Sequence, residues 1–361
     1  MAASARWQQL GAVAMPQAKS GSEYFECIRE SLSGFPIQER RSCAFGSALP
    51  AIDVAFGSHT LANRMGRSWQ YLSTDVAPPP DFKFYFLDED TSGYQIPTIP
   101  WQSFGFEAQG VLSGLDSEHR RAVWQTGSRS LFLLDLEAKW GMSWTKDANA
   151  VPHWESSFPL RYPIAWLGDR YPGMLVHAGA VGNQSGAVLI VGKSGSGKST
   201  TSLSALAHGL DYLGDDYVIV EPGKNPKIHA LSTTAKVSAN RVEELGLEQS
   251  DSYTLGVSDD EDKRVVYLEN FRDQIARERP LRAIIHPSIS PTGPRIEPMR
   301  KIAMLKALAP STLFQIPVNR EALFARLRDV VNSMPCFCFH VGPNLKENAV
   351  YLANFLTDLE P

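Results

Sequence analysis

The feature that most constrains this chain is a glycine-rich run that directly follows a short apolar segment. The apolar segment, residues 186–191, reads Gly-Ala-Val-Leu-Ile-Val, and its continuous hydrophobic character is typical of a strand buried on both faces. The run after it reads Gly-Lys-Ser-Gly-Ser-Gly-Lys-Ser-Thr and covers residues 192–200. A helix is predicted over 199–209, with Gly209 as its C-cap. The order of strand, glycine turn and helix predicts an α/β layer structure.

The glycine run has the full Walker A pattern, G-x-x-x-x-G-K-S. Its glycines let backbone N–H groups turn inward around a phosphate, where a Cβ would obstruct them. The helix that follows points its positive end at the same anion. Lys198 is expected to reach the β- and γ-phosphates, and the Ser199 hydroxyl to ligate Mg²⁺. The expected ligands are therefore ATP and Mg²⁺, and the other loop residues assigned to the nucleotide are Gly192, Ser194, Gly195, Ser196, Gly197 and Thr200.

Two adjacent acids, Asp215 and Asp216, lie within residues 210–220, which we interpret as a second strand. Two carboxylates near a triphosphate can have different roles: one can hold Mg²⁺ while the other accepts a proton from an attacking hydroxyl. A further candidate, His177, ends a short predicted strand over 174–176, which we expect to pair beside the 186–191 strand. A lone histidine at a strand end is more often structural than catalytic.

The distribution of tryptophan divides the chain. All eight tryptophans fall between Trp7 and Trp166. We predict a mostly β, aromatic-rich N-terminal domain over residues 1–170, with strands near 82–87 and 131–136, as a possible platform for a peptide or partner. Residues 171–361 are predicted to form the P-loop domain. Its further expected strands are 264–268, 281–286 and 313–317, and two amphipathic helices are expected around Leu327 and Leu352.

Composition narrows the class of protein. The 35 basic and 39 acidic side chains leave a net charge of −4, which argues against a nucleic-acid groove as the main function. Four cysteines are too few for a disulfide scaffold. There is no apolar run long enough for a membrane span, and the apolar patch at 10–15 is too short for a signal peptide. We therefore expect a cytoplasmic protein with reduced thiols and no membrane or nucleic-acid partner.

The central segment resembles the HPr kinase/phosphorylase family. The matching pieces are His177, the loop over 192–199 and the pair Asp215-Asp216. The spacing from Lys198 to Asp215 fits that family better than the related phosphoenolpyruvate carboxykinases. The resemblance is strong over residues 174–220 and does not extend to the first 165. It implies an HPr-kinase-like or carboxykinase-like P-loop fold, phosphorylation of a serine on a protein or peptide, and a possible homo-oligomer.

The resemblance also implies roles for individual residues. Asp215 would take the proton from the serine with His177 nearby, while Asp216 and Ser199 would serve Mg²⁺; the two aspartates could exchange these roles. The segment Lys263-Arg264 resembles the family's later basic residue near the phosphates, and Lys236 is a weaker candidate for such a contact.

Two departures from the family pattern refine the expectation. Thr200 replaces the glutamate that follows the Walker serine, and the downstream E-V-R-G-L-G-I signature is absent. The first departure argues against a second metal ion, and the second favours a kinase without efficient phosphorylase activity. The chain thus looks closer to the HPr-kinase-like tailoring enzymes of lasso peptides, which phosphorylate a hydroxyl of a precursor peptide. Two alternatives remain: an ATPase or small-molecule kinase of carboxykinase-like type, and a non-catalytic nucleotide-sensing module.

Overall fold

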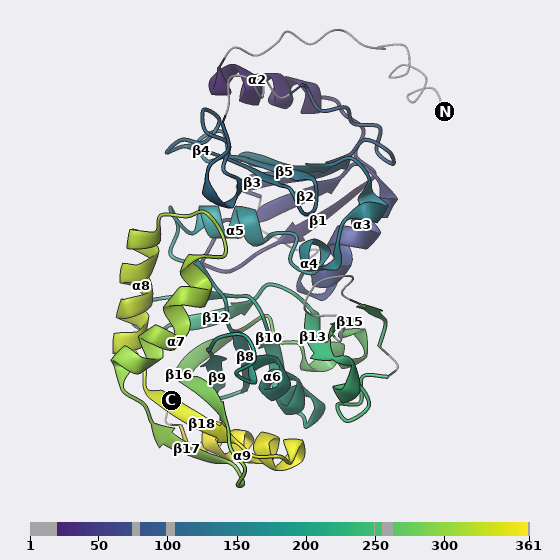
Figure 1. The fold of residues 1–361 in the computed structure, drawn as a ribbon. Helices are drawn as coiled ribbons and strands as arrows, with labels where there is room; N and C mark the ends of the chain where they lie inside the picture. The colour runs from purple at the N-terminus through teal and green to yellow at the C-terminus, as the bar shows by residue number, and fades with distance from the viewer. Residues whose placement is uncertain (1–19, 74–79, 99–104, 249, 255–262, 360–361) are drawn as a thin grey trace.

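A computed structural model describes residues 20–73, 80–98, 105–248, 250–254 and 263–359. The first sheet is mixed, with the strand order β1-β2-β3-β6-β5-β4 (Figure 1). Its strands are β1 (Glu39–Cys43), β2 (Ile52–Phe56), β3 (Phe82–Asp88), β4 (Arg120–Gln125), β5 (Ser130–Asp135) and β6 (Trp140–Thr145). β3 runs parallel to β2 and β6, and the other pairs are antiparallel. Phe82, Phe84 and Phe86 alternate along β3 onto one buried face, which fixes the register of the sheet against the core.

Helices cover both faces of this sheet. α2 (Gly21–Leu32) lies on the outer face, whereas α3 (His59–Gly66), α4 (His153–Ser156) and α5 (Arg161–Leu167) lie toward the second sheet (Figure 1). The side chains of Ser20 and Ser58 accept backbone N–H bonds at the starts of α2 and α3. The prediction of a mostly β region is therefore wrong, and the region is mixed α and β.

The second sheet is also mixed and has nine strands among the described residues. Its main path is β10-β8-β9-β16-β12-β11-β7. Off this path, β18 pairs with β16, and β17 pairs with β18. The strands are β7 (Met174–Val176), β8 (Gly179–Asn183), β9 (Gly186–Ile190), β10 (Asp211–Gly214), β11 (Val218–Glu221), β12 (Lys227–Ala230), β16 (Glu278–Ile289), β17 (Arg295–Pro298) and β18 (Cys336–Val341). β9, β16 and β18 are mutually parallel neighbours, as an α/β layer requires.

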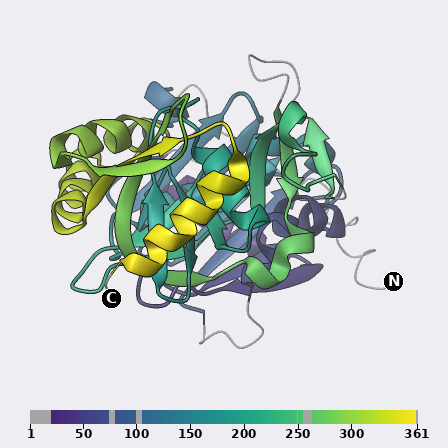
Figure 2. The same ribbon diagram turned by 90° about the horizontal axis from the view of Figure 1, so that it is seen from below.

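Helices pack on both faces of the second sheet as well. α6 (Lys198–Ala207) and α9 (Leu345–Asp358) cover one face, where Val188 and Ile190 of β9 meet Leu352. α7 (Lys301–Leu313) and α8 (Arg320–Ser333) cover the other face, which takes Leu189 of the same strand. Figure 2 shows α9 crossing the sheet obliquely, with α7 and α8 at its side. The continuous apolar run at 186–191 is thus explained by burial on both faces.

A small antiparallel sheet, β13-β15-β14, lies beside α6. It consists of β13 (Thr234–Ser238), β14 (Ser252–Thr254) and β15 (Lys263–Tyr267). Short 3₁₀ turns complete the described chain: η1 (Arg67–Leu72), η2 (Ala108–Gly110), η3 (Ala148–Ala150), η4 (Ala239–Arg241) and η5 (Glu269–Gln274). In the part of the chain that the structure describes, no helix combines the length and apolar character of a membrane span.

Most predicted elements are confirmed within a few residues, including the helix after the glycine run, which ends at Ala207 before Gly209 at φ +92°. Two strand predictions are wrong. Residues 210–220 form two strands, β10 and β11, because the chain turns at Asp215-Asp216-Tyr217 between them. Residues 313–317 form no strand: α7 ends at Leu313, and Ile316 enters the core from the connection to α8.

One apolar cluster joins the two sheets. It contains Phe84 and Phe132 of the first sheet together with Leu189 and Ile284 of the second. The indole Nε1 of the buried Trp166 donates to the Pro317 carbonyl at 2.9 Å, which ties α5 to the α7–α8 connection. The first sheet ends at residue 145 and the second begins at residue 174, and the division into domains at residue 170 stays a prediction.

The shared core predicts one cooperative unfolding transition. Trp166→Ala should lower the free energy of unfolding by about 3–5 kcal/mol, because it leaves a cavity between the two sheets. In urea, tryptophan fluorescence reports only on the region up to residue 166, whereas far-UV circular dichroism reports on the whole chain. The two signals should change together in the native protein and in the variant. Transitions at separate urea concentrations would show that the two regions unfold independently.

Candidate functional site

The glycine run forms the turn between β9 and α6. Gly195 and Gly197 have φ of +78° and +99°, in the left-handed region that favours glycine, and Gly197 immediately precedes the helix. A Cβ on Gly192 would lie 2.5 Å from Ser196 Oγ and 3.0 Å from His286 Nδ1, so a side chain there would displace both. The loop therefore keeps its backbone close around the helix N-terminus, which is the arrangement that binds phosphate.

Lys198 is buried and folds over this loop. Its Nζ donates to the carbonyl oxygens of Gly192 at 2.8 Å and Lys193 at 3.3 Å. The buried Oγ of Ser196 has no hydrogen-bond partner among the described residues. An unsatisfied buried hydroxyl is costly unless a ligand supplies the partner. The loop thus fits a phosphate group, which would satisfy Ser196 and draw the Lys198 ammonium away from the carbonyls.

Strand pairing brings the other predicted residues to the same edge of the sheet. Gly179 of β8 pairs with Ile190 of β9, and Ala180 pairs with Gly214 of β10. The start of β8 and the end of β10 therefore both lie beside the phosphate loop that follows β9. His177 thus lies in the connection between β7 and β8. The expectation that the strand over 174–176 pairs beside the loop strand is wrong, because β7 pairs with β11 and β8 takes that place.

The two aspartates differ in their surroundings. Asp215 is 1% exposed and accepts hydrogen bonds from the backbone N–H of Lys236 at 2.9 Å and from the Ser199 hydroxyl. Asp216 accepts at both oxygens, from His177 Nε2 at 2.7 Å and from Lys236 Nζ at 2.6 Å. Asp215 is thus turned toward the start of α6, whereas Asp216 is turned toward His177.

Burial and charge separate the acidities of the pair. Burial raises the pKa of Asp215 to about 6, and the adjacent charge of Asp216 adds to the rise. Burial opposes ionisation of Asp216 as well, but the Lys236 charge and the His177 hydrogen bond outweigh it and hold the pKa of Asp216 well below its usual range. The same carboxylate raises the pKa of Lys236 against the effect of burial. Asp216 and Lys236 therefore form a partly buried ion pair.

Lys236 and Tyr217 are the site residues that sequence reasoning underrated or missed. Lys236 lies on β13, and the backbone of this strand also donates to Asp215. The ring of Tyr217 lies 5.2 Å from that of His177, and its hydroxyl donates to Gln315 Oε1 at 3.1 Å. Tyr217 follows the acid pair directly, and this adjacency was the available signal. Lys236 was named only as a weaker candidate for a phosphate contact, because its contact with Asp216 depends on the small sheet.

The structure does not bring Arg264 to this cluster. Arg264 is exposed on β15 and pairs with Val237, so the pleat puts it on the opposite face from Lys236. The backbone of Lys263 pairs with Ser238, and its side chain lies outside the described part of the structure. Their assignment to the phosphates stays a prediction.

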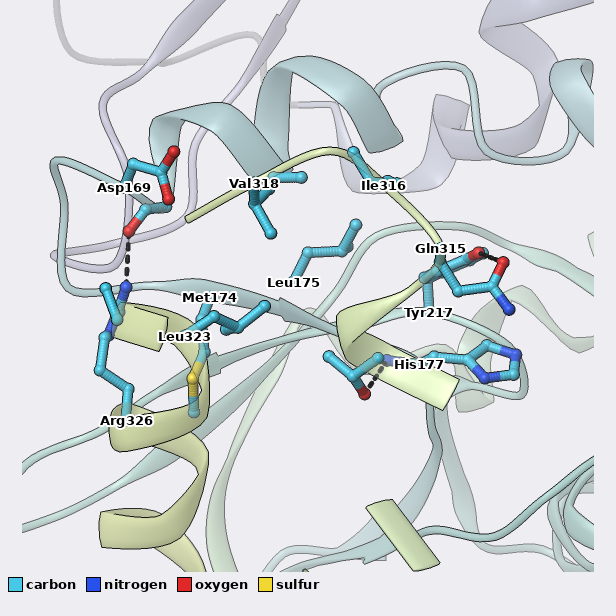
Figure 3. A pocket seen from close by; sticks show the side chains of 14 residues that line it. Asp169, Met174, Leu175, His177, Tyr217, Gln315, Ile316, Val318, Leu323 and Arg326 are labelled. Atoms are coloured by element: carbon cyan, nitrogen blue, oxygen red, sulfur yellow. Dashed lines mark hydrogen bonds between the residues drawn. The ribbon is translucent and has the colours of Figure 1, made fainter. Parts of the chain in front are cut away.

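A mostly apolar pocket of about 70 Å³ opens beside His177 and Tyr217 (Figure 3). Its apolar walls come from β7, the α7–α8 connection and α8 and are formed by Met174, Leu175, Ile316, Val318 and Leu323. Arg326 also lines it, but its guanidinium donates to the carbonyls of Gly168, Tyr171 and Pro172. The backbone N–H of His177 donates to Thr312 Oγ1 at 3.2 Å, which fixes the histidine at the pocket rim.

The described residues contain no cluster of three or more His, Cys, Asp or Glu side chains suited to a metal ion. Magnesium does not need such a cluster, because it commonly takes one or two protein oxygens together with phosphates and water. The hydrogen-bonded oxygens of Ser199 and Asp215, next to the phosphate loop, fit that role. The sequence had assigned Asp216 to the metal with Asp215 as the alternative.

Comparisons with known proteins add little to this geometry. No protein-family model matches the chain, and no curated protein sequence does. About half of the chain, 51%, resembles 99% of a solved structure described as the Hpr(Ser) kinase/phosphatase from Coxiella burnetii, with 14% sequence identity and a TM-score of 0.27. A likeness this distant carries no weight in assigning the site, which rests on the contacts above.

The partly buried ion pair predicts a pH-dependent loss of stability in Lys236→Met. Without the ammonium, Asp216 keeps a weaker counter-charge, so unfolding should become easier by about 1.5–3 kcal/mol at pH 8. Asp216 contributes stability above its unfolded pKa, and this contribution is lost as the pH falls through its low folded pKa. In the variant the carboxylates take up protons at higher pH, so the difference from the native protein should shrink toward pH 4.

Urea unfolding at pH 8 and pH 4.5 measures this difference. The exposed Lys224 supplies the matched control, and Lys224→Met should change stability by less than about 0.5 kcal/mol at either pH. An equal loss of stability for Lys236→Met at both values would contradict the ion pair.

Proposed function

We propose that the protein is an ATP- and Mg²⁺-dependent kinase that transfers the γ-phosphate to a serine hydroxyl of a protein or peptide. The observation that carries the proposal is the meeting of the glycine loop with the partly buried cluster of His177, Asp216 and Lys236 at one sheet edge. A loop alone would support only nucleotide binding. Transfer also needs groups aimed at the acceptor, and the cluster supplies them.

The loop and the start of α6 would hold the triphosphate. Backbone N–H groups at Gly195 and Gly197 and the helix N-terminus favour the negative charge, and Lys198 is within reach of the β- and γ-phosphates once it leaves its loop carbonyls. Ser199 and Asp215 are the residues that would hold Mg²⁺. When bound, Mg²⁺ neutralises charge that develops on the phosphate oxygens.

Asp216 and His177 would serve the serine acceptor. The family resemblance gave this role to Asp215, with the exchange of the two aspartates as the alternative. Both oxygens of Asp216 accept hydrogen bonds from cationic or polar side chains, and this orients the carboxylate and the imidazole rigidly. A serine hydroxyl beside them can pass its proton to His177 Nδ1, which has no hydrogen-bond partner among the described residues, while the serine oxygen attacks the γ-phosphorus. The bond from the γ-phosphorus to the bridging oxygen breaks, ADP leaves, and phosphoserine forms.

The pocket beside His177 supports a peptide acceptor over a small anionic substrate. Its walls are mainly apolar, and it has room for one side chain rather than a whole ligand. The one arginine that lines it, Arg326, already donates to backbone carbonyls. The described lining therefore offers no unpaired guanidinium to a carboxylate or phosphate. An apolar side chain next to the acceptor serine would fill this pocket.

Nucleotide binding is tested by Lys198→Met. Loss of a charge-assisted contact of about 1.5–3 kcal/mol should weaken Mg-ATP binding roughly tenfold to a hundredfold, measured by isothermal titration calorimetry. Lys193→Met is the matched control, because Lys193 is an exposed lysine of the same loop. Equal affinity of Lys198→Met and native protein for Mg-ATP would contradict the proposed nucleotide site.

Transfer is tested with radiolabelled ATP on an array of peptides that each carry one serine. The native protein should label a subset enriched in apolar neighbours of the serine. Asp216→Asn should reduce transfer at least about a hundredfold while Mg-ATP still binds, because it removes the carboxylate that orients His177 as the proton acceptor. Steady ATP hydrolysis with no labelled peptide would favour the ATPase alternative. Binding without any turnover would favour the nucleotide sensor.

A further inference from the structure

A second binding surface lies on the outer face of the first sheet, away from the phosphate loop. α2 packs there against the β5–β6 half, where Phe25 meets Trp140 with ring centroids 5.8 Å apart. The adjacent part of the same face, over β1 to β3, is left open beside α2. A groove of about 650 Å³ occupies it, and we call it the outer groove. Figure 1 shows α2 lying across the sheet on the side opposite the second sheet.

Four cations line the outer groove: Arg29, Arg40, Lys83 and Lys139. Arg29 pairs with Glu26 and Arg40 with Asp53, so part of their charge is balanced. Lys83 and Lys139 are exposed and form no ion pair with any residue in the described ranges. The two lysines are neighbours, because the Lys83 N–H donates to the Lys139 carbonyl at 3.1 Å. The groove therefore presents two exposed lysines whose backbones are neighbours and whose ammonium groups form no ion pair among the described residues.

The backbone adds to the case for Lys139. It has φ +56°, in the left-handed region, where a glycine would avoid the steric cost that a side chain brings. The floor of the groove is aromatic: Tyr85 and Phe35 are partly buried there, and Trp140 is buried beneath α2. Aromatic side chains with cations at their edge give contact area at low cost in conformational entropy.

We propose that the outer groove binds an acidic peptide segment that carries aromatic or apolar side chains. Charge complementarity selects acidic groups for Lys83 and Lys139, and the aromatic floor selects side chains that bury apolar surface. A nucleic acid fits less well. The cations are few and are mixed with Asp53 and Asp81, whereas a phosphate backbone needs a continuous basic track. The groove lies on the far side of the sheet from the glycine loop, so this binding does not depend on the proposed kinase activity.

The test uses full-length protein and a short fluorescein-labelled peptide of alternating Glu and Tyr residues, followed by fluorescence anisotropy. The double variant Lys83→Gln/Lys139→Asn should bind the peptide about tenfold more weakly than native protein. Asparagine is chosen because it tolerates the left-handed conformation. Binding should also weaken as salt is raised, since the charges are exposed. A peptide of alternating Lys and Tyr should not bind.

A matched control removes two exposed cations elsewhere, in Lys224→Gln/Arg272→Gln, and should leave peptide affinity unchanged. Mg-ATP affinity of the Lys83→Gln/Lys139→Asn variant should equal that of native protein, which separates this site from the nucleotide site and also reports that the variant is folded. Three results would overturn the proposal: no binding of the Glu–Tyr peptide at low salt, equal affinity of the double variant, or tighter binding of an oligothymidylate that the double variant loses.

Discussion

The candidate site depends on the position of β8 between β9 and β10. The pairs Gly179↔Ile190 and Ala180↔Gly214 bring three separate chain segments to one sheet edge: the approach to β8, the glycine loop and the acid pair. Because side chains alternate along a strand, a slip of one residue in either pairing would turn the neighbouring side chains to the other face. Gly179 permits the close approach, since a Cβ there would lie 2.5 Å from Ser202 Oγ of α6.

The acid pair is tolerated at this edge because its neighbours divide the charge. Two adjacent buried carboxylates would repel each other if both were ionised without compensation. Lys236 donates to Asp216 with its ammonium and to Asp215 with its backbone N–H, so one residue of β13 stabilises both. His177 completes the shell of Asp216. The result is one firmly ionised acid and one with a raised pKa, held in a single turn.

The part of the chain before residue 170 contributes to this site through aromatic packing. Phe158, which follows α4, lies edge-on to Tyr217 with ring centroids 5.1 Å apart, and Tyr217 in turn packs against His177. Ser232 and Thr233 also hydrogen bond to the carbonyls of Ser157 and Ser68. Residues before 170 therefore support the wall behind the histidine, while the opposite face of their sheet remains available for the outer groove. The two faces of one sheet thus serve different purposes.

The sequence by itself determined the local part of the site: the strand, glycine loop and helix over residues 186–207, and the presence of two acids one helix later. These features depend on neighbours in sequence, namely continuous burial, glycine conformations and a helix N-terminus. It did not determine which acid faces which partner, that the chain turns between β10 and β11, or that Lys236 neutralises Asp216. Those contacts join residues 20 to 39 positions apart through strand pairing across two sheets, and only the tertiary structure fixes such pairings.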